Sequence, residues 1–311
     1  MSTIKIEDIA HVRFQAPDLG EMQTFLEQFG LKPGLSDDGV LYARGTGPAP
    51  FLHATQPGEP RFVAIGFRAA STEDLHRLAE AEASTVEPHD APGGGFVVRL
   101  TDPDGYLVEV VAGQDMLPPL ALIPGEPHND ARAKARQRAA LRLPEGPATV
   151  VRLGHAVLEV TDFRASEAWY KARFGFITSD EIEMAPGLSI GAFMRCDRGE
   201  TPTDHHTLFL LQAPSAPRFN HAAFEVTDMD DLMCGHTHLK RARRTPAWGV
   251  GRHVLGSQIF DYWKDPWGHE LEHWTDGDLF TAADGSNTAT FRDLLNVQWG
   301  PLHPMMAGEQ A

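Results

Sequence analysis

Two eight-residue segments, HAVLEVTD at 155–162 and HAAFEVTD at 221–228, are identical at six positions, and both begin with histidine. Both segments are interpreted as short strands in which alternate residues point to opposite faces and one face is buried. Two weaker relatives, HVRFQAPD at 11–18 and AIGFRAAS at 64–71, lie earlier in the chain. A segment that recurs in this way predicts four copies of one supersecondary unit.

A second pair of similar segments closes each half of the chain, DPDGYLVE at 102–109 and DPWGHELE at 265–272. The DP-x-G sequence favours a tight turn, and the residues after it form a last strand. Alignment of the two segments places Glu109 opposite Glu272. The two halves of the chain are therefore expected to share one architecture.

The flanks of the fourfold repeat show where the halves differ. PRFVAIGF at 60–67 aligns with PRFNHAAF at 217–224, which places Ala64 opposite His221. His11 aligns with His155 in the same way. The first half thus retains one histidine and one glutamate of the pattern but has alanine where the second histidine would stand.

An amphipathic helix is expected after the first strand of each unit. Asp18 and Asp162 suit the N-caps of two of these helices, and Gly30 and Gly175 suit their C-caps. The predicted helical stretches are 22–30, 71–84, 167–175 and 227–242. Further strands are expected after the helix in each unit, and this combination predicts an α+β fold.

The four units divide the chain into two domains. The N-terminal, non-catalytic domain is expected at 1–113 and the C-terminal, catalytic domain at 150–280. The linker at 114–149 is rich in proline, alanine and charge, and NDARAKARQRAALR within it predicts one short helix. The tail at 281–311 has no strong pattern, and its end is expected to be frayed.

Composition narrows the class of protein. The 311 residues carry a net charge of −16, which disfavours binding to nucleic acid or to anionic membranes. Two cysteines, Cys196 and Cys234, are too few for a disulfide framework and fit a reducing compartment. No signal peptide is apparent at the start. We therefore expect a cytoplasmic globular protein.

The repeated histidines predict a metal centre. If the third and fourth units pack symmetrically, His155 and His221 converge, and the last strand brings Glu272 to the same face. Two histidines and one carboxylate form a facial triad that holds Fe(II) or Mn(II) and leaves coordination positions open. We expect one tightly bound metal per chain, because Ala64 cannot supply a ligand in the first half.

Three other carboxylates compete for this role. Glu159 and Glu225 lie four residues beyond their histidines, roughly 13 Å along a strand, so they are interpreted as structural. Glu270 shares a face with Glu272 and is a closer competitor. The repeat favours Glu272, because Glu270 aligns with Leu107 rather than with Glu109.

The unit layout, the two histidines with the glutamate, and the stretch FDYWKDPWGHELE at 260–272 resemble the type I extradiol ring-cleaving dioxygenases. These enzymes belong to the vicinal oxygen chelate superfamily. The resemblance implies four βαβββ modules paired into two cup-shaped, mostly antiparallel β domains. It also implies that the metal lies only in the C-terminal cup.

The same resemblance implies three further functional residues. The family has a tyrosine ten residues before the glutamate ligand, which is Tyr262 here, and a histidine nine residues before that tyrosine, which is His253. A histidine fifteen residues before the second histidine ligand corresponds to His206. His206 is expected to act as general acid and base, and His253 and Tyr262 as hydrogen-bond donors. His205 is expected to pack or to face solvent.

The favoured function is Fe(II)-dependent extradiol cleavage of a catechol, with both atoms of O₂ entering the product and no NADH or flavin required. Cleavage of a hydroquinone or trihydroxybenzene is an alternative within this class. A glyoxalase-like isomerase or lyase is a second class, and a metal-free binding or resistance module a third. The expected partners are a small aromatic diol and O₂, and we expect a homo-oligomer.

Overall fold

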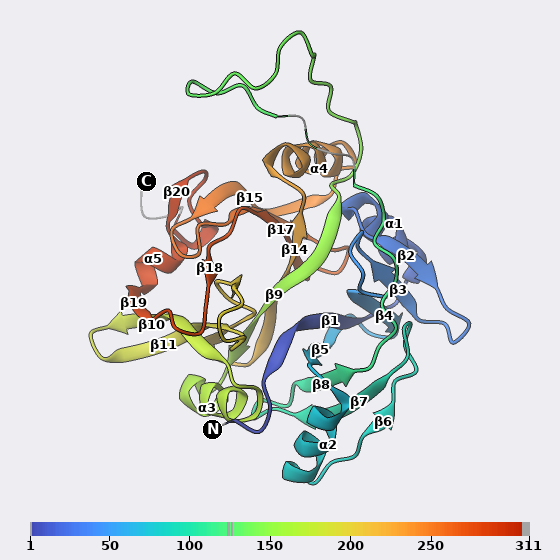
Figure 1. Cartoon of the computed structure of the whole chain (residues 1–311), viewed down its shortest axis with the longest axis vertical. Coiled ribbons are helices and arrows are strands. Elements are labelled where there is room, and N and C mark those ends of the chain that lie inside the picture. Colours follow the sequence, from blue (N-terminus) through green and yellow to red (C-terminus); the bar gives the residue numbers. More distant parts are fainter. Residues whose placement is uncertain (1, 123–124, 126, 307–311) are drawn as a thin grey trace.

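The computed structural model describes residues 2–122, 125 and 127–306, which form two large sheets with helices packed against them (Figure 1). The first sheet has the order β2-β3-β4-β1-β5-β8-β7-β6. Its strands are β1 (Ile6–Ala16), β2 (Lys32–Leu35), β3 (Leu41–Arg44), β4 (His53–Pro57), β5 (Arg61–Ala69), β6 (Glu87–Pro88), β7 (Phe96–Thr101) and β8 (Leu107–Ala112).

The second sheet has the order β19-β10-β11-β13-β9-β14-β17-β16-β15-β20. Its strands are β9 (Val150–Val160), β10 (Ile177–Ala185), β11 (Leu188–Arg195), β13 (Leu208–Gln212), β14 (Arg218–Val226), β15 (Thr245–His253), β16 (Ile259–Lys264), β17 (Glu270–Thr275), β19 (Asn287–Thr290) and β20 (Val297–Trp299). A separate pair joins β12 (Thr203–Asp204) to β18 (Leu279–Phe280).

Both sheets are built around the repeated segments. In the first sheet the opening strands of the two units, β1 and β5, pair antiparallel, and each pairs in parallel with the last strand of its own unit, β4 or β8. In the second sheet β9 and β14 pair antiparallel, flanked in parallel by β13 and β17. The predicted α+β fold of paired modules is therefore confirmed.

Each unit contains the predicted helix after its first strand. The helices are α1 (Leu19–Phe29), α2 (Thr72–Ala81), α3 (Phe163–Phe174) and α4 (Met229–Arg241). The side chains of Asp18 and Asp162 accept hydrogen bonds from the backbone three residues later, so both predicted N-caps are confirmed. Gly30 and Gly175 are left-handed at the C-caps, as predicted, because this conformation strains residues with a Cβ atom.

One hydrophobic core spans both halves of the chain and joins the two sheets. Polar contacts cross the same boundary: His273 Nε2 lies 2.7 Å from the carbonyl oxygen of Phe29, and Tyr106 donates a 2.9 Å hydrogen bond to the carbonyl oxygen of Glu159. The Glu159 contact lies on β9, the strand that also carries His155. The first half thus packs directly against a strand of the predicted catalytic half.

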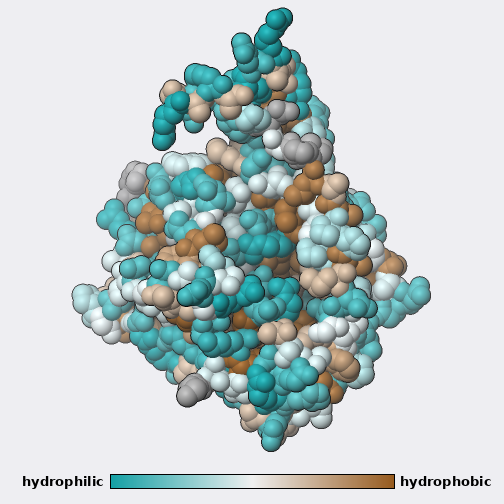
Figure 2. Space-filling view, viewed as in Figure 1, coloured by the Kyte–Doolittle hydropathy of each residue, from teal (hydrophilic) through white to brown (hydrophobic). Residues whose placement is uncertain are grey.

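The helix predicted at 129–142 is wrong. No helix forms in the described part of the linker, whose residues 127–142 are almost all exposed and extend away from the body beside α4 (Figure 1). Figure 2 shows the same extension as a largely hydrophilic projection. Like charges four residues apart, such as Arg132 and Arg136, disfavour an isolated helix, and no packed apolar face offsets the cost of nucleation.

The tail is more ordered than its sequence indicates. It supplies β19, which pairs in parallel with β10, and β20, which pairs with β15. Between them lies α5 (Phe291–Leu295), and a 3₁₀ turn follows at Pro304–Met306. The expected fraying of the last residues falls outside the described residues.

Candidate active site

The predicted metal ligands lie on three adjacent strands, with His155 on β9, His221 on β14 and Glu272 on β17. Ala223 on the central strand pairs with His155 on one side and with Glu272 on the other. His221 lies two residues from Ala223 and therefore shares its face of the sheet. The small side chain of Ala223 leaves space between the histidine and the carboxylate.

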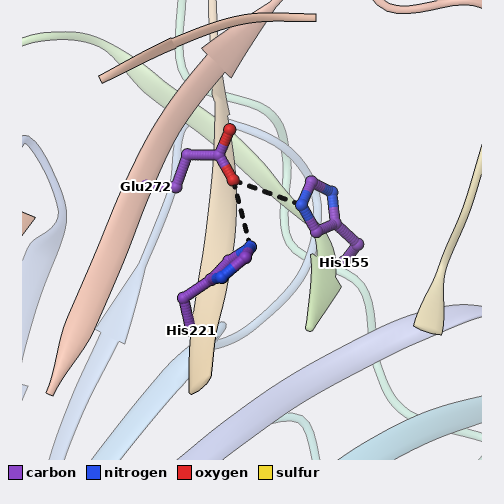
Figure 3. A group of neighbouring side chains, drawn as sticks. All are labelled: His155, His221 and Glu272. Atoms are coloured by element: carbon purple, nitrogen blue, oxygen red, sulfur yellow. Dashed lines mark ion pairs between the residues drawn. The ribbon is translucent and has the colours of Figure 1, made fainter. Parts of the chain in front are cut away.

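Candidate ligand atoms of these three residues all lie within 4.8 Å of one another. Glu272 Oε2 is 3.2 Å from His155 Nε2 and 3.3 Å from His221 Nε2 (Figure 3). Both imidazoles point toward the same carboxylate oxygen in that view. Glu272 is 0% exposed, and His155 is buried with it.

The protonation states fit a metal centre. The imidazoles of His155, His221 and His253 outweigh the effect of burial and hold the pKa of Glu272 well below its usual range, whereas burial lowers the pKa of His155. An ionised carboxylate thus faces a neutral histidine, as metal binding requires. Neither Glu272 oxygen makes a hydrogen bond of good geometry in the described structure. A buried carboxylate whose oxygens lack well-formed hydrogen bonds is costly, and a divalent cation would compensate its charge.

In the first half, the residues that correspond to His155 and Glu272 are His11 and Glu109, and Glu109 is bound by arginines. A carboxylate oxygen of Glu109 lies 2.7 Å from His11 Nε2. Glu109 also accepts hydrogen bonds from Arg13 Nε, at 2.7 Å, and from Arg99 Nε, at 3.1 Å. Ala64 pairs with Arg13 two residues beyond His11, just as His221 pairs with Val157 two residues beyond His155. Two guanidinium groups therefore occupy the surroundings of Glu109 and neutralise it.

We predict one equivalent of metal per chain, bound in the second half. His11→Ala should leave the metal content unchanged, whereas the matched change His155→Ala should reduce it severely, because only His155 has both partner ligands. Metal analysis of both purified variants is the measurement. Two equivalents in the wild type, or metal loss in His11→Ala, would contradict this assignment.

His206 lies beside the triad, with its ring centroid 4.0 Å from that of His155. The neighbouring His205 is buried against Phe193 and Phe280, so it packs as expected, but its side chain is also hydrogen-bonded at both nitrogens. Its Nε2 lies 2.7 Å from Asp180 Oδ2, and its Nδ1 lies 3.0 Å from His206 Nδ1. Gly256 allows this arrangement, since a Cβ there would lie 2.9 Å from His205 Nδ1.

The hydrogen-bond chain assigns a tautomer to His206. Burial and the His205 hydrogen bond act in opposite directions on Asp180, and its pKa is lowered, so Asp180 accepts the proton of His205 Nε2. With the single proton of the His205 ring placed at Nε2, its Nδ1 is the acceptor and His206 Nδ1 is the donor of the 3.0 Å hydrogen bond between the two rings. His206 Nε2 is thereby left as a base. Burial, followed by the nearby His155, also keeps the pKa of His206 well below its usual value.

His253 and Tyr262 lie on the other side of the triad. His253 Nε2 is 3.0 Å from the Tyr262 hydroxyl, and the Tyr262 ring meets the His221 ring edge-on at 5.0 Å. Burial and the charge of Glu272 raise the pKa of Tyr262 well above its usual value, so its hydroxyl remains a donor. Both residues line the same cavity as His206.

This cavity, of about 680 Å³, borders His155, His221 and the three residues carried over from the resemblance. Several lining residues were not predicted from the sequence. His303, to which the sequence pattern gives no role, lines the cavity and meets Trp248 edge-on at 4.6 Å. His303 belongs to the C-terminal tail, and the local sequence does not predict that the tail folds back over the cavity. Trp248, which also lines the cavity, and Asp180, which contacts His205, lie in segments without a motif.

The competing carboxylates have other partners. Glu159 accepts two hydrogen bonds from Arg218, at 2.6 and 2.7 Å, and Glu225 is paired with Arg152. Glu270 lies 3.6 Å from Lys264. The strand register also repeats the alignment: Glu270 pairs with His221 as Leu107 pairs with Ala64.

A family model described as the Glyoxalase/Bleomycin resistance protein/Dioxygenase superfamily matches residues 8–110 and 152–273. The chain belongs to this superfamily. The matched segments contain both halves of the repeat and all three candidate ligands.

Relatives within this superfamily include ring-cleaving enzymes. Metapyrocatechase 2 of Cupriavidus necator is 28% identical over 95% of this chain and 89% of its own length. The iron-dependent extradiol dioxygenase of Rhodococcus jostii is 25% identical over 88% of this chain and 90% of its own.

The fold is also found with a different named activity. The Mn(II)-bound glyoxalase of Novosphingobium aromaticivorans aligns with a TM-score of 0.79 and 24% identity over 97% of this chain and 93% of its own.

No helix among the described residues has the length and apolar character needed to cross a membrane.

Proposed function

We propose that the protein is an Fe(II)-dependent extradiol dioxygenase that opens the ring of a catechol next to its diol. The observation that supports this most strongly is the placement of His206 against the triad, inside the cavity that His155 and His221 border. The named activities of the two ring-cleaving relatives support the same function. Mn(II) is the other metal that suits two histidines and a carboxylate.

His155, His221 and Glu272 would hold the metal, which when bound supplies a chelation point for the diol and for O₂. His206 Nε2 would take a proton from a diol hydroxyl and later return one to the opening ring. His253 and Tyr262 would donate hydrogen bonds to developing negative charge. The apolar surroundings of the cavity would exclude water from these steps.

The glyoxalase-like alternative receives less support from the donor set. Enzymes of that kind usually carry four protein ligands with two carboxylates, whereas the described residues bring three ligands together. Glu270 would be the candidate for a second carboxylate, but it lies against Lys264. Isomerisation would also not require His253 and Tyr262 beside the ligands.

Metal reconstitution tests the proposed function. Metal-free protein should be inactive toward catechol in air, and Fe(II) with ascorbate should restore formation of the yellow ring-opened product. Fe(II) is needed because O₂ activation requires a reduced metal. Full activity without metal, or restoration by Zn(II) alone, would refute the dioxygenase assignment, whereas activity with Mn(II) would agree with it.

The Asp180–His205 pair should position His206 during turnover. Asp180→Ala should lower kcat about tenfold, at the lower end of the loss found when a buried partner that orients a site residue is removed. Asp180→Asn should retain more activity, because its amide oxygen can still accept the His205 proton. Steady-state kinetics on metal-loaded samples is the measurement. Wild-type kcat in Asp180→Ala would show that the pair has no catalytic role.

A further inference from the structure

The cavity extends well beyond the space that a catechol ring needs beside the triad. Its volume, about 680 Å³, lies in the middle of the range for pockets that hold whole small molecules. A ring with two hydroxyl groups would occupy only the part that borders His155 and His221. The remaining part must therefore face a ring substituent or water.

One wall of this remaining part is apolar and begins at the catalytic histidine. The Phe193 ring meets His206 edge-on at 4.7 Å and stacks on Phe209 at 4.0 Å. These rings belong to a hydrophobic cluster against which Leu255 and, from α5, Phe291 and Leu294 are packed. All of these side chains line the cavity. The tail thus completes an apolar surface that runs outward from the reacting centre.

The cavity also contains cations, but both have carboxylate partners. Arg218 makes a two-point contact with Glu159, through Nε at 2.7 Å and Nη2 at 2.6 Å. Lys264 lies 3.6 Å from Glu270. Among the described lining residues these four charges sum to zero. A substrate carboxylate would therefore have to displace Glu159 or Glu270 from its partner, or remain unpaired.

The two arginines closest to the site in sequence do not change this balance. Arg152 binds Asp204 through both terminal nitrogens and Glu225 through Nε. Arg252 binds Asp276. Neither is among the cavity-lining residues.

We propose that the substituent of the substrate is a neutral apolar group, alkyl or aryl, that packs against the wall of Phe193, Phe209, Leu255, Phe291 and Leu294. This rests on the proposed ring-cleaving function and names its substrate class. A buried methylene contributes about fourfold to binding, until the wall is covered. A buried carboxylate without a cationic partner is strongly disfavoured.

A matched substrate pair tests the proposal. 4-Ethylcatechol and 3,4-dihydroxyphenylacetate have substituents of nearly equal size, one neutral and one anionic. With the iron-loaded enzyme we expect kcat/KM for 4-ethylcatechol to exceed that for the acid by about 100-fold. Lengthening the alkyl chain should raise kcat/KM further. Equal values, or a preference for the acid, would overturn the proposal.

A variant of the wall adds a second test. Leu294→Arg should place a cation at the apolar wall and reduce the preference for 4-ethylcatechol at least about tenfold, whereas the matched control Leu294→Met should preserve it. An unchanged preference in Leu294→Arg would mean that the substituent does not contact α5, and would overturn the assignment of the wall.

Binding without turnover separates this inference from the proposed function. Under anaerobic conditions, calorimetry should show that 4-ethylcatechol binds about 100-fold more tightly than 3,4-dihydroxyphenylacetate. If this preference appears but no catechol is opened in air, the substituent wall stands and the dioxygenase function fails. If catechol is opened but neither binding nor kcat/KM favours the neutral compound, the function stands and the substituent wall fails.

Discussion

Replacement of Glu272 by glutamine is expected to remove most of the metal and nearly all turnover. The change keeps the size of the side chain but deletes the charge that would compensate a dication, in a position that is 0% exposed. Metal affinity should fall by more than the roughly 10- to 100-fold that loss of a partner outside the ligand set costs. Metal content after dialysis and the rate of ring opening are the two measurements.

Glu270→Gln is the matched control for this change. Glu270 lies on the same strand and the same face as Glu272, but its carboxylate contacts Lys264 instead of the candidate ligands. The variant should retain its metal and most of its activity. Metal loss in Glu270→Gln with retention in Glu272→Gln would mean that the wrong carboxylate of β17 has been assigned.

His206→Phe should retain the metal and still bind catechol, but turn over about 10²- to 10⁴-fold more slowly, the usual cost of losing a general acid or base. Phenylalanine fills the space beside Phe193 but cannot carry a proton. Single-turnover kinetics, with metal content determined on the same sample, is the measurement.

His303→Phe serves as the control for His206→Phe, because it makes the same exchange at another histidine of the cavity. His303 contacts Trp248 rather than the candidate ligands, so kcat should fall less than tenfold. Wild-type turnover in His206→Phe at unchanged metal content would remove His206 from the mechanism.

The central part of the fold could be predicted because the sequence repeats itself. Strand side chains alternate with a period of two, so aligned segments place aligned residues on the same face. This is why Ala64 and His221, or Glu109 and Glu272, take equivalent places in the two sheets. The relation depends only on residue spacing within each repeat.

Features that depend on distant or unrepeated segments could not be predicted. The partner of His205 is Asp180 on β10, 25 residues away, and no pattern marks that strand position. The order of the tail comes from pairing with β10 and β15 rather than from its own periodicity. In the linker a helix was predicted that does not form. Residues 129–142 have good helix propensity, but they have no surface to pack against.

Ring opening under ¹⁸O₂ tests the central claim most directly. The iron-loaded protein should convert catechol to a yellow product that contains both labelled oxygen atoms, with cleavage next to the diol. A product that carries one labelled atom or none, or a ring opened between the two hydroxyl-bearing carbons, would contradict extradiol dioxygenation by this site.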